Sequence, residues 1–284
     1  YLACRKGGAA ADVVWAQSLQ AETAAANQQS FGAVLWDLQS FFDYIDHSTL
    51  RRRALAMGMH PVIVEMALDA FTAARHLQLK EGIAPPLYPG RGVMAGHTYA
   101  KALLTAYCAE PVDRWQERHP DCSIELYVDD ASVCAHGDTE AEVMQRLIPA
   151  AHDLMRVIRD ELMCSIAAEK AATVASSRRL AQRIRSALGV FGGAGSESHA
   201  ANLGIDFGAG AKRGRTKKCV RAQRLWKGRM RKKNLRKLRN LVGPRVASHV
   251  YAAGILPSID YGAEVNGLDD REMGIIERIA GAAS

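Results

Sequence analysis

The Tyr-Val-Asp-Asp segment at residues 127–130 restricts the fold of this chain more than any other. Ser-Ile-Glu-Leu at 123–126 precedes it and Ala-Ser-Val-Cys at 131–134 follows it, and both flanks contain residues that favour β-strands. The pattern predicts a β-hairpin with the tetrapeptide at its tight turn. Two adjacent carboxylates at such a tip repel each other, and a bound divalent cation would offset the repulsion. The alternative is a solvated acidic turn, because Asp is common in turns.

A second acidic position follows a short apolar run. Residues Ala33–Trp36 have the continuous hydrophobicity of a buried central strand, and Asp37 stands at the end of that run. A buried carboxylate is costly unless it is paired or bound to a metal. Asp37 and Asp129, on neighbouring strand ends, can share two Mg²⁺ ions, an arrangement that phosphoryl-transfer enzymes use. Alternatively, Asp37 caps the turn or helix that follows.

Together these segments resemble the reverse transcriptases of non-LTR (LINE-type) retrotransposons. The first palm motif of that family reads apolar-Asp-x-x-x-Ala-Phe-Asp, often followed by Val/Ile-Asp-His. Residues 35–47 of this chain read Leu-Trp-Asp-Leu-Gln-Ser-Phe-Phe-Asp-Tyr-Ile-Asp-His. The acidic hairpin is similar to the second palm motif, and the separation of about ninety residues also agrees.

Four further segments are similar to the same family, in the same order. Residues 90–97 resemble its Gly-Val-x-Gln-Gly-Asp loop, and residues 162–170 resemble a segment that ends in lysine. Residues 202–205 resemble its Tyr-Leu-Gly-Ile stretch, and residues 255–264 its Leu-Pro-x-x-x-Tyr-Gly-x-Glu stretch. The resemblance therefore covers nearly the whole chain.

The resemblance implies an α+β fold, a right-hand polymerase palm whose antiparallel sheet packs on helices, with remnant fingers and a helical basic thumb. We expect the remnant of the fingers at 1–30, the palm at 31–208, and the thumb with the start of a C-terminal connection at 209–284. The implied function is template-directed DNA synthesis from RNA, as part of a retrotransposon polyprotein. The implied partners are an RNA template, a DNA primer and dNTP, in the nucleus or cytoplasm and without a membrane; the oligomeric state is left open.

The resemblance also implies roles for individual residues. Asp37, Asp129 and Asp130 would be catalytic ligands of two Mg²⁺ ions, with Mn²⁺ as a substitute, and Leu38 would be a further metal ligand. Lys170 would be a catalytic acid that protonates the pyrophosphate leaving group; the alternative is a solvated lysine on a strand end. The expected substrate-binding residues are Phe42 as a steric gate against the ribose 2′-hydroxyl, Gly92 and Gly96 beside the template–dNTP pair, and Tyr127 against the primer end. For Phe42 the alternative is ordinary core packing.

Positive charge is concentrated in one stretch. Residues 211–240 contain 15 Lys or Arg and no acid, while the rest of the chain has 22 basic and 30 acidic residues, a net charge of −8. The stretch reads as a basic helical segment with an apolar side, interrupted at Gly228, and such a patch attracts a phosphate backbone. The expected nucleic-acid-binding residues are Lys217, Lys218, Arg221, Arg224, Lys227, Arg229, Arg231 and Lys232. Alternatives are a nuclear-import signal, a solvated basic face, or a membrane surface.

Several features depart from the family pattern. Ala95 stands where a glutamine normally supports the templating nucleotide, His97 where an acid is common, and Asn266 near a usual Trp. Little of the fingers segment precedes the first palm motif, so we expect an N-terminally truncated copy. A rival interpretation is a non-catalytic, nucleic-acid-binding remnant of a retroelement. A second rival, a Mg²⁺ phosphohydrolase without a template, leaves the basic stretch unexplained.

The remaining pattern predicts the secondary structure coarsely. The six cysteines are scattered and give neither a zinc knuckle nor a disulfide framework, which favours a reducing compartment. We expect a strand at 32–37; helices at 48–58, 61–74, 98–116 and 139–162; a hairpin at 77–87; a strand at 167–175; a Gly/Ser loop at 192–198; and a strand at 202–207 that closes the palm.

Overall fold

The fold is built around a mixed sheet in which one long strand holds the central position. The computed structural model describes residues 9–80, 82–193, 196–209 and 219–284. The strand order is β4-β5-β1-β7-β8, and β6 also pairs with β1. All pairs are antiparallel except β7 with β8. The strands are β1 (Ser30–Gln39), β4 (Cys122–Tyr127), β5 (Asp130–Gly137), β6 (Ser165–Ile166), β7 (Ala172–Ala175) and β8 (Ser196–Glu197).

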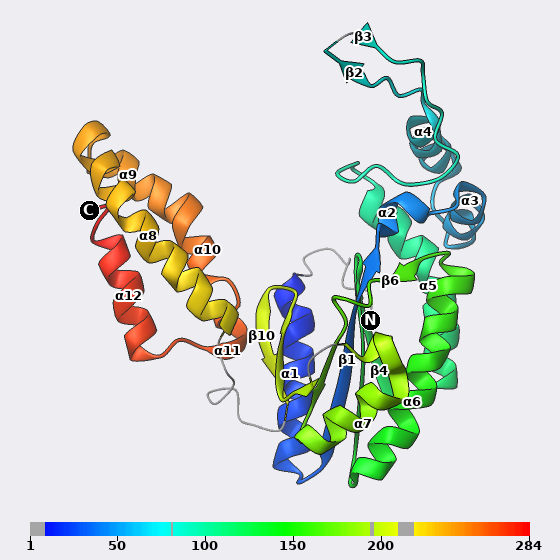
Figure 1. The fold of residues 1–284 in the computed structure, drawn as a ribbon. Helices are drawn as coiled ribbons and strands as arrows, with labels where there is room; N and C mark the ends of the chain where they lie inside the picture. The colour runs from blue at the N-terminus through cyan, green and yellow to red at the C-terminus, as the bar shows by residue number, and fades with distance from the viewer. Residues whose placement is uncertain (1–8, 81, 194–195, 210–218) are drawn as a thin grey trace.

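Helices cover one face of this sheet and form the largest core with it. Val34, Trp36 and Leu38 of β1 point into this core, as alternate residues of a strand must. The helices are α2 (Phe41–Tyr44), α3 (His47–Ala56), α4 (Pro61–Thr72), α5 (Ala100–Arg118), α6 (Glu140–Arg156), the π-helical turn η1 (Val157–Glu161), α7 (Arg178–Leu188) and the 3₁₀ turn η2 (Gly189–Gly192). A small hairpin, β2 (Gln78–Leu79) with β3 (Gly82–Ile83), projects away from the body beyond α4 (Figure 1).

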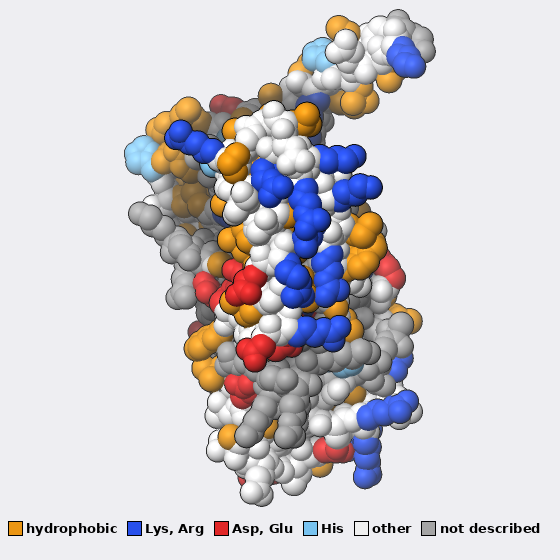
Figure 2. Space-filling view, turned by 90° about the vertical axis from the view of Figure 1, so that its left-hand side faces the viewer, with side chains coloured by type: hydrophobic (Ala, Val, Ile, Leu, Met, Phe, Trp, Pro, Cys, Tyr) orange, Lys and Arg blue, Asp and Glu red, His pale blue; other side chains and the backbone are white. Residues whose placement is uncertain are grey.

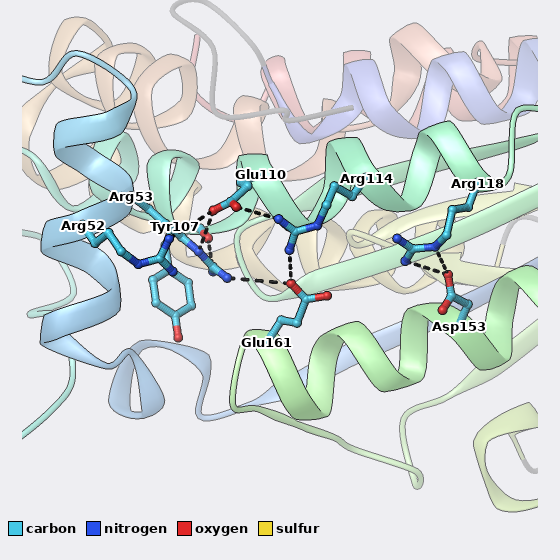
Figure 3. Close-up of polar contacts among 8 residues, drawn as sticks. All are labelled: Arg52, Arg53, Tyr107, Glu110, Arg114, Arg118, Asp153 and Glu161. Atoms are coloured by element: carbon cyan, nitrogen blue, oxygen red, sulfur yellow. Dashed lines mark hydrogen bonds and ion pairs between the residues drawn. The ribbon is translucent and has the colours of Figure 1, made fainter.

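An ion-pair network holds three of these helical segments together (Figure 3). Arg53 of α3 is only 5% exposed; its guanidinium donates to the Tyr107 carbonyl at 2.6 Å and lies 5.1 Å from the Tyr107 ring centroid. Glu110 of α5 pairs with Arg53 at 3.4 Å, and Arg114 of α5 pairs with Glu161 of η1. A buried charge of this kind is tolerated because it is paired and hydrogen-bonded. The network fixes α3 and η1 against α5 beneath the sheet.

The opposite face of the sheet is covered by α1 (Ala10–Ala26) and by a second hairpin, β9 (His199–Asn202) with β10 (Ile205–Gly208). Val14 and Ala21 of α1 pack with Leu35 of β1 and Phe207 of β10 in a separate core. This face receives the side chains of Leu35 and Asp37, which alternate with those in the helical core. Asp37 and Asp130 lie on this face, at the end of β1 and the start of β5.

The C-terminal helices form their own small domain (Figure 1). Its core contains Leu225, Leu235, Ile259 and Ile279. The elements are α8 (Cys219–Val242), α9 (Pro244–Val250), the π-helical turn η4 (Tyr251–Ile255), α10 (Leu256–Asp260), α11 (Ala263–Asn266) and α12 (Asp270–Ala280). Within the described part of the chain, no helix combines the length and the apolar character needed to cross a bilayer.

The mixed helix and antiparallel-sheet architecture confirms the predicted fold class, and the acidic hairpin, its central partner strand and the four named helices are where the sequence predicts them. Three local expectations are wrong. Residues 202–207 do not form one strand, because Leu203 and Gly204 both have positive φ and turn the chain between β9 and β10. Only residues 172–175 of the predicted 167–175 strand lie in β7. Gly228 does not interrupt the basic helix, since α8 continues through it.

Candidate active site on the palm

Strand register brings the predicted acidic residues to one edge of the sheet. Asp37 of β1 lies directly opposite Asp130 of β5, and Tyr127 of β4 lies opposite Asp130 on the other side. Residues directly opposite each other share a face of a sheet, so these three side chains emerge together on the face that α1 partly covers. The Leu38 N–H donates to the Asp129 carbonyl at 2.6 Å, which ties the hairpin turn to the end of β1. The backbone thus sets Asp37 and Asp130 opposite each other, with Asp129 in the adjoining turn, from two segments distant in sequence.

The turn of the acidic hairpin has an unusual backbone. Val128 has φ +59°, in the left-handed region that a β-branched residue rarely adopts. A positive φ at the first of two central residues is typical of a type II′ turn, which suits the right-handed twist of the strands on either side. The conformation costs on the order of 1–3 kcal/mol, which the surrounding strand pairs must offset. In return, Asp129 lies in the turn itself and Asp130 at the first position of β5.

The electrostatics of the site are those of carboxylates crowded together. Burial, followed by the charges of Asp129 and then Asp37, raises the pKa of Asp130 to about 6, and Lys170 opposes this shift. Lys170 Nζ lies 3.0 Å from both carboxylate oxygens of Asp37, and the hydrogen bond to Asp37 raises the pKa of Lys170. The ammonium of Lys170 therefore remains charged at neutral pH.

A cavity of about 140 Å³ opens beside these residues. Asp37, Tyr127, Asp130 and Lys170 line it together with apolar side chains from α1, β1 and β9. Carboxylate oxygens are the ligands that Mg²⁺ and Mn²⁺ prefer, and the raised pKa of Asp130 reflects negative charge that a cation would neutralise. The donor set therefore fits a divalent metal chemically. However, no three His, Cys, Asp or Glu side chains among the described residues converge as a ready-made metal site, and Asp37 instead faces Lys170.

The glycine loop is docked against the segment that follows β1. The Val93 N–H donates to the Phe42 carbonyl at 2.7 Å, and the Gly92 N–H donates to the Ile45 carbonyl at 2.8 Å. Gly92 has φ +97°, and a Cβ there would lie 3.2 Å from the Asp43 carbonyl oxygen, so a side chain has no room. Phe42 is half-buried against the helical core. The structure thus brings Phe42 and Gly92 together, whereas Gly96, with φ +87°, has open space around its Cβ position.

His47 is a contributor that sequence reasoning missed. Its Nε2 lies 2.7 Å from the Gly92 carbonyl oxygen, so it holds the glycine loop from the start of α3. Asp46 caps the same helix by accepting from the Thr49 N–H at 2.7 Å. The Ile-Asp-His ending of the first palm motif was the available signal, because a helix cap next to a ring nitrogen can fix a neighbouring loop.

The basic helix presents a row of charge to solvent (Figure 2). The buried positions of α8 are four, three and seven residues apart, which keeps them on one side of the helix, and most of the charged residues lie at exposed positions between them. Of the predicted set, Lys227, Arg229 and Arg231 are exposed and Lys232 is half-buried, while Lys217 and Lys218 lie outside the described residues. Lys233, Arg236 and Lys237 extend the row and are also exposed.

Arg221 and Arg224, which were predicted to contact nucleic acid, have partners within the protein in this structure. Arg221 is only 3% exposed, and its guanidinium donates to the Ile259 carbonyl at 3.1 Å. Arg224 donates to the carbonyls of Ser258 and Gly204 and stacks over the Tyr261 ring. Both side chains lie on the inner side of α8, where Arg is used for its fixed donor geometry rather than for attraction to phosphate.

Comparison with known proteins agrees with this geometry. Residues 3–205 match the reverse transcriptase (RNA-dependent DNA polymerase) family. No curated protein matches the chain. Among solved structures, apo telomerase from Candida tropicalis aligns with 96% of this chain and 50% of its own, at 10% identity and a TM-score of 0.52. A form of apo telomerase from the same organism, truncated from the C-terminal domain, aligns with 72% of this chain and 39% of its own, at 12% identity and a TM-score of 0.49.

These structural likenesses concern the fold alone, and the chain spans half or less of the length of each telomerase chain. The family match covers the acidic hairpin, the strand that carries Asp37 and the glycine loop. The fold is that of a polymerase palm, and the chain belongs to the reverse transcriptase (RNA-dependent DNA polymerase) family.

Proposed function

We propose that this chain synthesises DNA on an RNA template by nucleotidyl transfer at the acidic hairpin. The observation that carries the proposal is the register of β1 and β5, which sets Asp37 opposite Asp130 with Lys170 at 3.0 Å from Asp37. The primer 3′-hydroxyl oxygen forms a bond to the α-phosphorus of a dNTP. The bond between the α-phosphorus and its bridging oxygen breaks, and pyrophosphate leaves.

Asp37, Asp129 and Asp130, with the Leu38 carbonyl, would hold two divalent cations, Mg²⁺ or Mn²⁺. When bound, such cations activate the attacking hydroxyl and neutralise charge on the phosphates. Lys170 is charged and exposed at the mouth of the cavity. From there its Nζ can give a proton to the departing pyrophosphate oxygen once Asp37 has another positive partner.

The half-buried rings of Phe42 and Tyr127 supply the surfaces for the sugar and the primer end. Phe42 is held through its own carbonyl by Val93, so its position depends on the glycine loop. A rigid ring fixed in this way would exclude a 2′-hydroxyl by contact, which is the role proposed for Phe42. Gly92 and Gly96 would leave room for the template–dNTP pair.

The exposed row on α8, including Lys227, Arg229 and Arg231, would hold the template–primer backbone. In this proposal residues 31–208 are the palm and 209–284 the thumb with the start of a C-terminal connection. Helix α1, within the segment 1–30 assigned to the fingers, packs directly on the palm sheet. We also propose that the parent protein is a non-LTR retrotransposon polyprotein, on the strength of the motif at residues 35–47.

Primer extension on poly(rA)/oligo(dT) with Mg²⁺ and dTTP tests the proposal, with Asp129→Ala as the matched control. We expect wild-type protein to extend the primer, and the variant to bind template–primer but lose extension by several orders of magnitude. Equal extension by both proteins would contradict the assignment of the site. Template binding without extension by the wild type would instead favour a non-catalytic remnant of a retroelement.

A further inference from the structure

Three buried polar side chains lie close to the candidate active site, on α1, β5 and β9. Gln17 of α1 is fully buried, Ser132 of β5 is 5% exposed and Asn202 of β9 is 7% exposed. Gln17 and Ser18 are the polar residues on the buried face of α1, between Val14 and Ala21. A buried polar side chain of this kind holds neighbouring elements in place through its hydrogen bonds. An apolar residue of equal size would pack as well but would not make those bonds.

The Gln17 amide joins two separate sheets. Its Nε2 donates to the Ser132 Oγ, and its Oε1 accepts from Asn202 Nδ2 at 2.6 Å. Ser132 in turn donates to the Glu125 carbonyl across the acidic hairpin at 3.4 Å. Ser132 lies two residues from Asp130, so the two side chains share a face of β5. The strands β9 and β10 form a sheet of their own, so the Gln17 amide is a polar bridge between that sheet and the acidic hairpin, β4–β5, which is the catalytic hairpin of the proposed function.

The hairpin β9–β10, which the bridge joins, is in turn bonded to the C-terminal domain that carries the basic row. The Leu203 carbonyl accepts from the Tyr261 hydroxyl at 3.2 Å, and the Gly204 carbonyl accepts from Arg224 at 3.0 Å. On the next strand, Asp206 accepts from the N–H groups of Val220 and Arg221, both at 2.9 Å, at the start of α8. Figure 1 shows β10 between α1 and the helices of the C-terminal domain. Hydrogen bonds and the backbone of residues 202–206 thus together form a path from beside Asp130 to the helix that carries the basic row.

We propose that Gln17 and Asn202 are positioning residues, which fix the distance and orientation between the catalytic hairpin and the basic helix domain. This inference rests on the proposed function, because the two parts must hold one template–primer together. The amide is suited to the role because its donor and acceptor are used in opposite directions, so neither strand can shift without breaking a bond. Gln17 is fully buried and does not line the cavity, whereas Asn202 forms part of the cavity wall beside Asp37 and Asp130.

The test compares Gln17→Met, Asn202→Leu and the double variant, with Gln20→Met as control. Gln20 is one turn along the same helix and accepts from Ser123 of the same hairpin, but it has no bond to Asn202. The readouts are the Kd for poly(rA)/oligo(dT) and kcat per folded molecule, measured below the unfolding temperature. Each single variant is expected to weaken template–primer binding about 2- to 30-fold, the range that such couplings cover, with a smaller change in kcat.

The double variant is expected to be no worse than the more affected single variant, because both break one path, while Gln20→Met binds like wild type. Additive losses, or equal losses in Gln20→Met, would overturn the proposal. Tyr261→Phe removes only the last hydroxyl of the path and provides a milder variant if Gln17→Met does not fold. Its template–primer Kd is also expected to rise, and an unchanged Kd would overturn the proposal.

Amide hydrogen exchange separates this inference from the proposed function. Exchange at residues 203–204 and at Val220 and Arg221 is expected to accelerate in Gln17→Met, even if the wild type neither binds template–primer nor extends it. Failure of the wild type in the nucleic-acid assays would refute the proposed function. Unchanged exchange in the variant would refute the path.

Discussion

Asp130 shows how the site accumulates unfavourable charge. Its carboxyl group is partly buried, faces Asp37 across the strand pair and adjoins Asp129 in the chain. Each of these features favours the protonated form. Together with the positive φ of Val128, they make the hairpin tip a place where the fold gives up stability, as sites built for ligands commonly do.

The charge of Asp130 should make stability depend on pH. Its pKa is about 6 in the folded protein against 3.8 ordinarily, so the folded state binds more protons between these values and stability falls as pH rises from about 4 to about 6. The full shift corresponds to about 3 kcal/mol, which solvent screening of this partly exposed group reduces to on the order of 1 kcal/mol.

Asp130→Asn removes this titration. In EDTA at pH 7 the variant is expected to be more stable than wild type by on the order of 1 kcal/mol, and at a pH of about 3.5 by much less. Urea unfolding at the two pH values measures the difference. Added Mg²⁺ is expected to stabilise wild type more than the variant. If the difference in unfolding free energy between the two proteins does not change with pH, the pKa of the Asp130 carboxyl group is not raised in the folded state.

Single residues differ in how far the sequence predicts their place. The positions of Asp37, Asp129 and Asp130 follow from local patterns, because strand ends and tight turns are local features. The pair between Lys170 and Asp37 spans 133 residues and depends on strand order, which no local pattern contains. Arg221 and Arg224 match the charge pattern of α8, but both lie on its side toward α10, where Arg221 is buried and Arg224 is half-buried.

At the scale of elements, the sequence predicts those with a clear hydrophobic pattern. The continuous apolar run of β1 and the helical spacing of apolar residues in α4 are such patterns, and both elements form where the patterns indicate. The β9–β10 turn was missed because Leu203 adopts φ +48°, which a leucine does not signal. Helix α7 was also missed, although Ser177 caps it and Leu180, Ile184 and Leu188 recur on its buried face.

Gly228 has a packing role in α8 that its low helix propensity does not indicate. Ala is normally the better helix former by about 0.5–1 kcal/mol. Here a Cβ would lie 2.8 Å from Ile259 Cγ2 and 3.1 Å from Ile279 Cδ1, so α8 approaches α10 and α12 closely at this point. The residue that reads as a helix interruption is therefore a packing contact.

Two glycine substitutions should change the stability of the C-terminal domain in opposite directions. Gly228→Ala is expected to destabilise the C-terminal domain by about 1–3 kcal/mol through overpacking. Gly274→Ala, in α12, meets only the flexible end of Arg278 and is expected to stabilise it by about 0.5–1 kcal/mol. Urea unfolding, with hydrogen exchange of α8 amides to localise the effect, measures both. Stabilisation by both substitutions would mean that α8 does not approach α10 and α12 closely at Gly228.

At the scale of the whole molecule, charge is divided between two regions. The stretch 211–240 is strongly basic and the remainder carries a net charge of −8. A polyanion is therefore attracted to one side of the molecule and repelled from much of the other. This division orients a duplex before any specific contact forms.

Salt dependence should report on that orientation. Replacing Lys227, Arg229 and Arg231 with Ala is expected to reduce the slope of log Kd against log salt for template–primer by about 2–3, because each neutralised phosphate adds about 0.9 to that slope. Arg178→Ala with Arg179→Ala, exposed on α7 across the sheet, is the matched control and should leave the slope unchanged. Equal effects from both sets would indicate diffuse attraction rather than a defined face.

The central position of β1 also affects how the protein forms during synthesis. Its two main neighbours are β5, at residues 130–137, and β7, at residues 172–175. At about 5–20 residues per second, a ribosome completes the second neighbour roughly 7–27 s after β1. For that time the most apolar strand of the palm has an unpaired edge, which invites aggregation or chaperone binding. The C-terminal helices pack mainly on one another, within residues 219–284, and can assemble once that segment has emerged.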